Sequence, residues 1–144
     1  MTPPPGTPVA ETVVAVRMYE LDSFGHANHA VFLNHFEHAR YLALEEAGFT
    51  WSSLADHDWH IYVVRIEVDY LDEAKAGDTL LVRTWAESFK RTRMVLAQEM
   101  VRVDDPEAVV ARARVTAVWI GPDRRPMRVP DHVREGLSGS PGGR

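Results

Sequence analysis

The feature that most constrains this chain is a single long helical pattern set among strand-like segments. Apolar side chains recur in it at spacings of three and four residues and define one helix face: Phe32, Phe36, Ala39, Ala43 and Ala47. The pattern predicts a helix that begins near Asn28 or His29 and ends at Gly48, which suits a C-terminal cap. The alanines leave room for close approach, so we expect a sheet to pack on this face.

Strand-like segments lie on both sides of this helix. We predict five strands, at 11–19, 60–71, 79–89, 92–103 and 108–120. The last four have the spacings of an antiparallel meander. The segment 49–58 is predicted to be a connector with one short turn at 51–54, and a short helix is expected near Pro130 or Asp131. This order predicts an α+β domain whose one sheet packs on one main helix.

Length and composition bound the remaining possibilities. With 144 residues and 45% hydrophobic content, the chain is predicted to form one domain over 11–137, with disordered tails at 1–10 and 138–144. The lack of cysteine excludes disulfides, thiolate metal sites and a cysteine nucleophile, and it favours a cytoplasmic protein. A net charge of −5 argues against broad affinity for nucleic acid, and no apolar run suggests a membrane span. Any anion-binding site must therefore be local.

A carboxylate stands just ahead of the predicted helix start. The loop that joins the first strand to the helix carries Asp22, Gly25, His26 and Asn28. The first turn of a helix presents unpaired N–H groups and a partial positive charge, which suit a developing anion. Asp22 thus offers a base beside an anion site, although an aspartate here also suits a turn that only shapes the loop.

The same segment carries a motif that resembles a known enzyme family. From Asp22 to Arg40 the residues read D-x-x-G-H-x-N-H-A-x-F followed by E-x-A-R. This is similar to the acyl-CoA thioesterases of the hot-dog fold, in the 4-hydroxybenzoyl-CoA thioesterase-like family, over about residues 13–133. The resemblance implies an antiparallel five-stranded sheet wrapped around the long helix, a homodimer or homotetramer, and active sites formed between subunits. It also implies no metal and no cofactor, because coenzyme A is part of the substrate.

Thioester chemistry fits these residues. A thiol has a pKa of about 8.5, so the thiolate leaves with little or no protonation, and one carboxylate plus one oxyanion site can suffice. Asp22 is predicted to act as a general base that directs a water, or as a nucleophile that attacks the carbonyl. By the resemblance, the backbone N–H near His29 meets the oxyanion. Gly25 is expected to supply a backbone conformation that a Cβ would resist.

Other residues are candidates for binding the acyl-CoA substrate. His26 and Asn28 are predicted either to orient the substrate or only to hydrogen-bond the loop to itself. Aromatic residues that could line an acyl pocket are Phe24, Phe32, Trp51, Trp59 and Tyr62. Two basic clusters could bind the phosphates of coenzyme A or be solvated faces: Lys90, Arg91 and Arg93, our first choice, and Arg124, Arg125 and Arg128.

The same residues leave alternatives open. Glu37 is a rival carboxylate on the helix, although Arg40 three residues on predicts an i,i+3 ion pair for it. Two histidine pairs could meet on a helix face without forming a known metal-ligand motif: His26 with His29, and His35 with His38. The competing functions are a thioesterase for acyl groups on an acyl carrier protein, itself acidic, a non-catalytic acyl-binding protein and, less well matched, a hot-dog hydratase.

Overall fold

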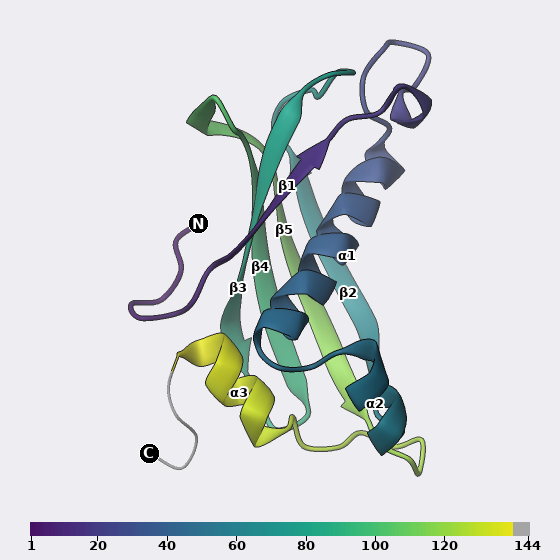
Figure 1. The fold of residues 1–144 in the computed structure, drawn as a ribbon, viewed down its shortest axis with the longest axis vertical. Helices are drawn as coiled ribbons and strands as arrows, with labels where there is room; N and C mark the ends of the chain where they lie inside the picture. The colour runs from purple at the N-terminus through teal and green to yellow at the C-terminus, as the bar shows by residue number, and fades with distance from the viewer. Residues whose placement is uncertain (140–144) are drawn as a thin grey trace.

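The computed structural model describes residues 1–139, which form one sheet and three helices (Figure 1). The elements in chain order are β1 (Ala10–Ala15), the 3-10 turn η1 (Met18–Glu20), α1 (His29–Glu46), α2 (Trp51–His57), β2 (His60–Tyr70), β3 (Thr79–Phe89), β4 (Arg93–Arg102), β5 (Asp105–Ile120) and α3 (Asp131–Ser138). Ser138, predicted to open the C-terminal tail, is the last residue of α3, and residues 140–144 lie outside the described part.

The first strand and the predicted connector differ from the sequence prediction for local reasons. β1 ends at Ala15 rather than at residue 19, because the Glu20 carboxylate accepts a hydrogen bond from the Arg17 N–H (2.8 Å) and closes η1. α2 is a full helix rather than a single turn, since Thr50 and Ser53 cap it reciprocally. None of the residues of α2 is buried, so it lies on the surface of the domain.

The sheet is antiparallel throughout, in the order β1-β3-β4-β5-β2. β3, β4 and β5 form the predicted meander, and Arg102 pairs with Asp105, which extends β5 beyond its predicted start. The prediction that β2 belongs to the same meander is wrong, because β2 pairs with β5 at the far edge. The connection 71–78 therefore crosses the end of the sheet, where Arg102 binds Asp72 (3.1 Å) and Asp78 (3.0 Å).

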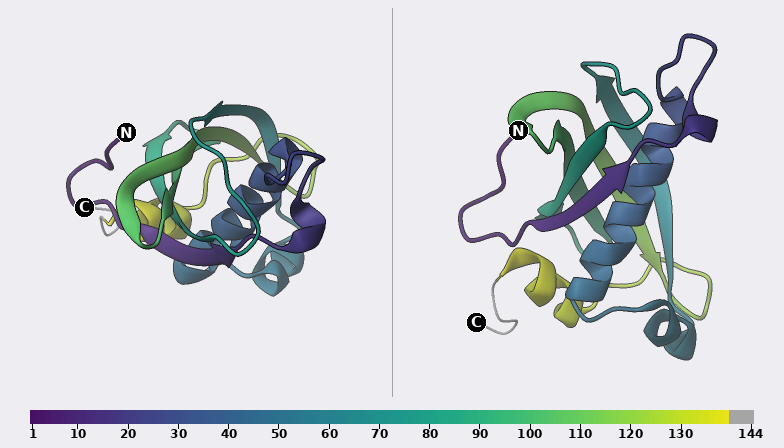
Figure 2. Two further views of the ribbon diagram at one scale, coloured as in Figure 1. Left: turned by 90° about the horizontal axis from the view of Figure 1, so that it is seen from above. Right: turned by 45° about the horizontal axis from the view of Figure 1, so that its top comes forward.

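α1 lies against the concave face of the sheet, which curls around it (Figure 2). The predicted apolar face is buried over most of its length, at Phe32, Phe36, Ala39 and Ala43. One core cluster joins the first half of α1 to β1, β3, β4 and β5, and a second joins its last turns to α3 around Trp119. Each large apolar side chain so buried contributes about 1.5 to 3 kcal/mol, so packing holds α1 in place. This confirms the predicted hot-dog arrangement.

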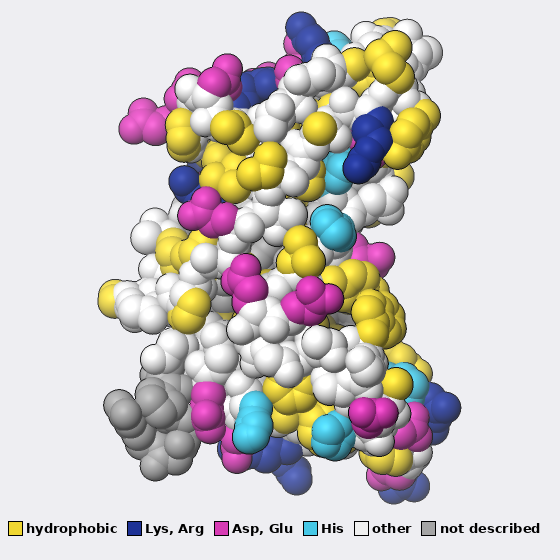
Figure 3. All heavy atoms as spheres, in the orientation of Figure 1, with side chains coloured by type: hydrophobic (Ala, Val, Ile, Leu, Met, Phe, Trp, Pro, Cys, Tyr) yellow, Lys and Arg dark blue, Asp and Glu magenta, His cyan; other side chains and the backbone are white. Residues whose placement is uncertain are grey.

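β2 is a long and exposed edge strand. It has 11 residues, and most of them are exposed on both faces. Its exposed large apolar side chains are Tyr62, Val63, Val64, Ile66 and Tyr70. Figure 3 shows hydrophobic side chains beside α1, on the side of the molecule where β2 lies. A long apolar edge of this kind is a template for pairing with another chain.

The helices themselves carry no membrane signal. Within residues 1–139, no helix combines the length and the apolar character needed to cross a membrane.

Candidate active site

The loop between η1 and α1 holds Asp22 in a compact turn. Oδ1 of Asp22 accepts hydrogen bonds from the N–H groups of Phe24 (2.8 Å) and His26 (3.2 Å). The Asp22 N–H donates to the His26 carbonyl (2.7 Å), and Gly25 has a φ of +80°, the left-handed region that favours glycine. Asp22 therefore does shape the loop. Among the described residues, however, only its Oδ1 is engaged, and Oδ2 has no partner.

These N–H donors also set the charge of Asp22. The His26 N–H, followed by the Phe24 N–H, holds the pKa of the Asp22 carboxyl below its usual value, and the side-chain charges of His26 and His29 act in the same direction. The lower pKa makes Asp22 a weaker proton acceptor but keeps it ionised at neutral pH. An ionised carboxylate is what either predicted role requires.

The start of α1 leaves the backbone N–H of His29 without a partner among the described residues. The Asn28 N–H donates to the Glu20 carbonyl (2.9 Å), and Asn28 Oδ1 accepts from the Ala30 N–H (2.9 Å). The Val31 N–H donates to the Asn28 carbonyl (2.9 Å). In the part of the chain that the structure describes, the His29 N–H has no such partner. Asn28 thus serves as the helix cap, and of the N–H groups predicted near the oxyanion only that of His29 is available.

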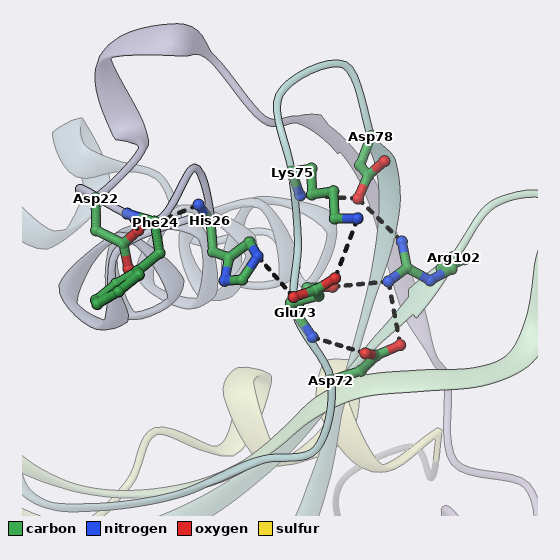
Figure 4. Close-up of polar contacts among 8 residues, drawn as sticks. All are labelled: Asp22, Phe24, His26, Asp72, Glu73, Lys75, Asp78 and Arg102. Carbon is green, nitrogen blue, oxygen red and sulfur yellow. Dashed lines mark hydrogen bonds and ion pairs between the residues drawn. The ribbon is translucent and has the colours of Figure 1, made fainter.

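His26 ties this loop to the connection between β2 and β3 (Figure 4). Its Nε2 lies 2.7 Å from Oε2 of Glu73, and the Ala27 N–H donates to the Ala74 carbonyl (2.7 Å). From β4, Arg102 donates to the Glu73 carbonyl (2.7 Å) and so fixes this connection to the sheet. The His26 backbone thus bonds within the loop, as one of its two predicted roles has it, whereas its imidazole contacts a different segment, which neither role included.

Two buried ionisable side chains, Glu20 and His35, meet near the start of α1; the sequence prediction missed Glu20 and considered His35 only as a possible metal ligand. Oε1 of Glu20 lies 3.4 Å from Nε2 of His35, and both side chains are 9% exposed. The geometry of this contact is not that of a hydrogen bond, and Nε2 of His35 has no other partner among the described residues. On the other side of the helix start, the Tyr70 hydroxyl donates to the His29 carbonyl (3.0 Å). Glu20 and Tyr70 therefore hold the start of α1 from two directions.

We expect Glu20→Gln to lower the free energy of unfolding by about 1 kcal/mol at neutral pH. Burial raises the pKa of the Glu20 carboxyl, but the Arg17 N–H and the charges of His35 and Arg17 outweigh it, so the pKa lies below its usual value. The stabilisation is then present above the unfolded pKa of about 4.3 and is lost as the pH falls through the folded value. Urea unfolding at a series of pH values should show the difference shrinking in acid. Glu107→Gln, at an exposed carboxylate, is the control, and a pH-independent difference for Glu20→Gln would contradict this account.

The apolar hollows of the chain lie toward the other end of α1. One, of about 330 Å³, lies between α1, α2 and the start of β2 and is lined by three of the predicted aromatic residues, Trp51, Trp59 and Tyr62. A second, of about 370 Å³, shares Tyr41 with it and extends over the sheet. Tyr41 is about 18 Å along α1 from His29, at 1.5 Å per residue. Asp22 lines neither hollow.

The other two aromatic candidates lie elsewhere. Phe24 is 83% exposed on the Asp22 loop, and Phe32 is 4% exposed within the core beneath the start of α1. A side chain as buried as Phe32 offers little surface to a substrate, so this structure gives no support to the prediction that Phe32 binds substrate. Its ring packs edge-on against Tyr70 (5.3 Å between centroids) and supports the helix start instead.

Arg40 has a different partner from the one that its spacing predicted. Its Nη1 donates to Oε1 of Gln98 (3.0 Å) inside the domain, and no ion pair with Glu37 forms in the described structure. Burial lowers the pKa of the Arg40 guanidinium, while the charge of Glu37 acts in the opposite direction. Arg40 lies on the buried face of α1, and its partner Gln98 is itself anchored there by a hydrogen bond to the Phe36 carbonyl (2.9 Å). The predicted Glu37–Arg40 pair is therefore wrong, although both side chains border the second hollow.

The predicted phosphate-binding cluster also lies away from Asp22. Lys90, Arg91 and Arg93 are exposed at the β3–β4 hairpin, at the lower end of Figure 1, whereas the Asp22 loop is at the upper end. Of the residues that the structure describes, no three His, Asp or Glu side chains are grouped so that they could hold a metal ion. The chain thus separates its candidate catalytic groups from its hollows and from the predicted phosphate-binding cluster.

Comparison with known proteins places this geometry in a family. The sequence model of the thioesterase-like superfamily matches residues 16–137. The long-chain acyl-CoA thioesterase FadM of Escherichia coli is 31% identical over 111 residues, which cover 76% of this chain and 82% of that protein. The acyl-acyl carrier protein thioesterase ATL2 of Arabidopsis thaliana is 29% identical over 124 residues, or 86% of this chain. The chain spans only 65% of the length of ATL2.

Solved structures share the fold. The 1,4-dihydroxy-2-naphthoyl-CoA thioesterase of Synechocystis superposes with a TM-score of 0.82 at 20% identity, over 90% of this chain and 96% of that one. At that identity the likeness concerns the arrangement of the sheet around α1 alone.

Proposed function

This chain belongs to the thioesterase-like superfamily, and on that premise we propose that it is a thioester hydrolase that cleaves an acyl-CoA to a free acid and coenzyme A. The observation that carries the proposal is the presence of Asp22 beside the start of α1, where the His29 N–H is unpaired in the described chain. Asp22 offers an ionised oxygen, and His29 offers a donor at the positive end of a helix. A thioester carbonyl between them would meet a base and an oxyanion donor at once.

In the proposed mechanism, Oδ2 of Asp22 takes a proton from a water whose oxygen bonds to the carbonyl carbon. The carbonyl π electrons move onto its oxygen, which accepts a hydrogen bond from the His29 N–H, a contact worth about 2.7 to 4 kcal/mol. Collapse of this intermediate breaks the C–S bond, the thiolate leaves, and the proton returns from Asp22 to solvent. Asp22 as nucleophile would use the same two groups, with a mixed anhydride that water then hydrolyses.

We expect that protonation of Asp22 does not lower kcat/KM at any pH above about 5. The pKa of the Asp22 carboxyl is lowered from its usual value of about 3.9, so the active carboxylate is present above that value and is lost only as the pH falls through the lower one. A pH profile of acyl-CoA hydrolysis measures this directly. An acid limb near neutral pH that persists in both His26→Gln and His29→Gln would mean that Asp22 is protonated in the resting enzyme, against the proposed role.

The assembly that we propose is a dimer paired through β2. The exposed apolar edge of β2 supports it, since a second copy running antiparallel would cover that edge and extend the sheet. Such pairing sets the end of β2 in one copy beside its start in the other. Tyr70, at the end of β2, contacts His29, whereas Tyr62, near its start, lines the first hollow. The Asp22 loop of each copy would then face the hollows of its partner.

The same assembly gives the hairpin cations a role. The β3–β4 hairpin lies at the end of the molecule that would approach the Asp22 loop of the other copy, and it carries Lys90, Arg91 and Arg93. We propose that they bind the phosphates of coenzyme A there, while the acyl group enters the hollows. Exposed cations suit this use because phosphate oxygens form charge-assisted hydrogen bonds with them.

Thiol release from a panel of short, long and aromatic acyl-CoA substrates tests the proposed activity. We expect hydrolysis of at least one apolar class, because the first hollow is lined largely by aromatic and aliphatic side chains, and the preferred member identifies the acyl group. If no acyl-CoA is cleaved but the same acyl groups are released from an acyl carrier protein, the alternative carrier-protein thioesterase holds. Binding without hydrolysis of either would identify a non-catalytic acyl-binding protein.

A further inference from the structure

Cations without a carboxylate partner gather at one end of the molecule. Most lysines and arginines elsewhere in residues 1–139 lie within ion-pair distance of an aspartate or glutamate, such as Arg102 with Asp78 and Arg114 with Glu87. Eight lysine and arginine side chains of residues 1–139 have no aspartate or glutamate within that distance. Two of them, Arg40 and Arg83, lie elsewhere. The other six lie in the segments 90–93 and 121–135: Lys90, Arg91, Arg93, Arg124, Arg125 and Arg134. Within the described residues no carboxylate lies within ion-pair distance of these side chains, although Arg124 contacts His60, which lies 2.9 Å from Asp58.

The fold brings these two segments together. The Val129 N–H donates to the Arg91 carbonyl (2.8 Å), and the Arg134 guanidinium donates to the carbonyls of Lys90 and Arg91 (3.1 Å to the latter). The turn that follows β5 is thus fastened to the β3–β4 hairpin. Arg124 extends this group of cations to the start of β2, where its Nη1 lies 3.2 Å from Nε2 of His60. We name the resulting surface, formed by Lys90, Arg91, Arg93, Arg124 and Arg125, the basic end.

The basic end is broad and its net charge opposes that of the whole chain. From the β3 side of the hairpin to β2 it crosses three strand spacings, or roughly 14 Å. Segments 90–93 and 121–135 contain seven cationic and three anionic side chains, in a chain whose net charge is −5. Of the anions, Asp131 pairs with Arg128 and Asp123 accepts from the Arg125 N–H (3.0 Å). Figure 3 shows Lys and Arg side chains at this lower end, among histidines and carboxylates.

We propose that the basic end is a docking surface for an acidic carrier protein that delivers the acyl thioester on its phosphopantetheine arm. This rests on the proposed function, and it adds a second source of substrate beside acyl-CoA. The cations are exposed on the outside of the fold rather than within either hollow, and they spread over two segments, which suits the acidic face of a carrier protein. His60, which Arg124 contacts, lines the first hollow, so a carrier docked here would present its arm at the hollow's mouth.

The test compares one acyl group on three carriers: an acidic acyl carrier protein, coenzyme A and pantetheine. We expect the double variant Arg124→Gln/Arg125→Gln to lower kcat/KM for the carrier-protein substrate by about tenfold or more, because charge steering raises association rates by factors of that size. Hydrolysis of the other two thioesters should change less than about twofold. Arg83→Gln, at an unpaired cation in the middle of β3, is the matched control and should leave all three unchanged. The loss should diminish as salt is added.

Two other results would overturn the docking surface. An equal loss for acyl-CoA and for the carrier-protein substrate would assign these arginines to the phosphates of the arm or of coenzyme A, and no loss for either would leave them without a role in docking. If the native protein cleaves none of the three, the proposed function fails. Fluorescence anisotropy with labelled carrier protein then tests the docking surface independently of activity. Binding that weakens with salt and in the double variant supports the docking surface. No binding rejects it.

Discussion

Asp22→Asn is expected to lower kcat for acyl-CoA hydrolysis by about 100-fold or more without unfolding the protein. The amide oxygen of asparagine can still accept hydrogen bonds from the Phe24 and His26 N–H groups, which keeps the loop closed. What it loses is the ionised oxygen that takes a proton or attacks the carbonyl. Thiol release under saturating substrate, with thermal unfolding of the same preparation, separates this chemical loss from a structural one.

Two further variants sharpen this result. Asp22→Ala removes both loop hydrogen bonds as well as the charge, so it should lose at least as much activity and also some stability. Glu37→Gln removes an exposed carboxylate from α1 and should retain nearly native activity. If Asp22→Asn stays active while Glu37→Gln does not, the carboxylate on α1 is the catalytic one and the proposed mechanism must be abandoned.

The parts of the site that sequence predicted well depend on neighbours close along the chain. The Asp22 turn, the left-handed Gly25 and the helix start at His29 follow from residues within a few positions of one another. The burial of His35 also had a signal, because it lies one turn after Phe32 on the apolar face of α1. Glu20 had none, since its segment read as the continuation of a strand.

The parts that sequence missed depend on contacts between distant segments. The Glu73 partner of His26 requires β2 to lie at the far edge of the sheet, so that its connection to β3 crosses beside the Asp22 loop. The inward direction of Arg40 depends on Gln98, 58 residues away. The two basic clusters read as separate features because the hydrogen bonds of Arg134 that unite them close only in the folded chain.

Asp22 and the hollows lie apart in one chain, so the proposed dimer predicts that two inactive variants recover activity when they are refolded together. Asp22→Asn protein should lack the catalytic oxygen, and Leu54→Asp protein should lack acyl binding, because a carboxylate in an apolar hollow is costly to desolvate. Leu54 is half-buried on α2 and packs against the second core cluster, so thermal unfolding of this variant must show that the fold is retained. Each variant alone is expected to be nearly inactive.

Refolding the two variants together should restore activity to about a quarter of the native value, if subunits pair at random. Half of the dimers are then mixed, and each mixed dimer has one site that combines the intact Asp22 of one copy with the intact hollow of the other. Refolding Asp22→Asn with Asp22→Ala is the control and should restore nothing, since no native carboxylate is present. If the first mixture is also inactive while co-purification of differently tagged copies shows mixed dimers, each chain uses its own hollow. The acyl group would then have to lie along α1 within one subunit, about 18 Å from Tyr41 to the helix start, and the exposed edge of β2 would need another explanation.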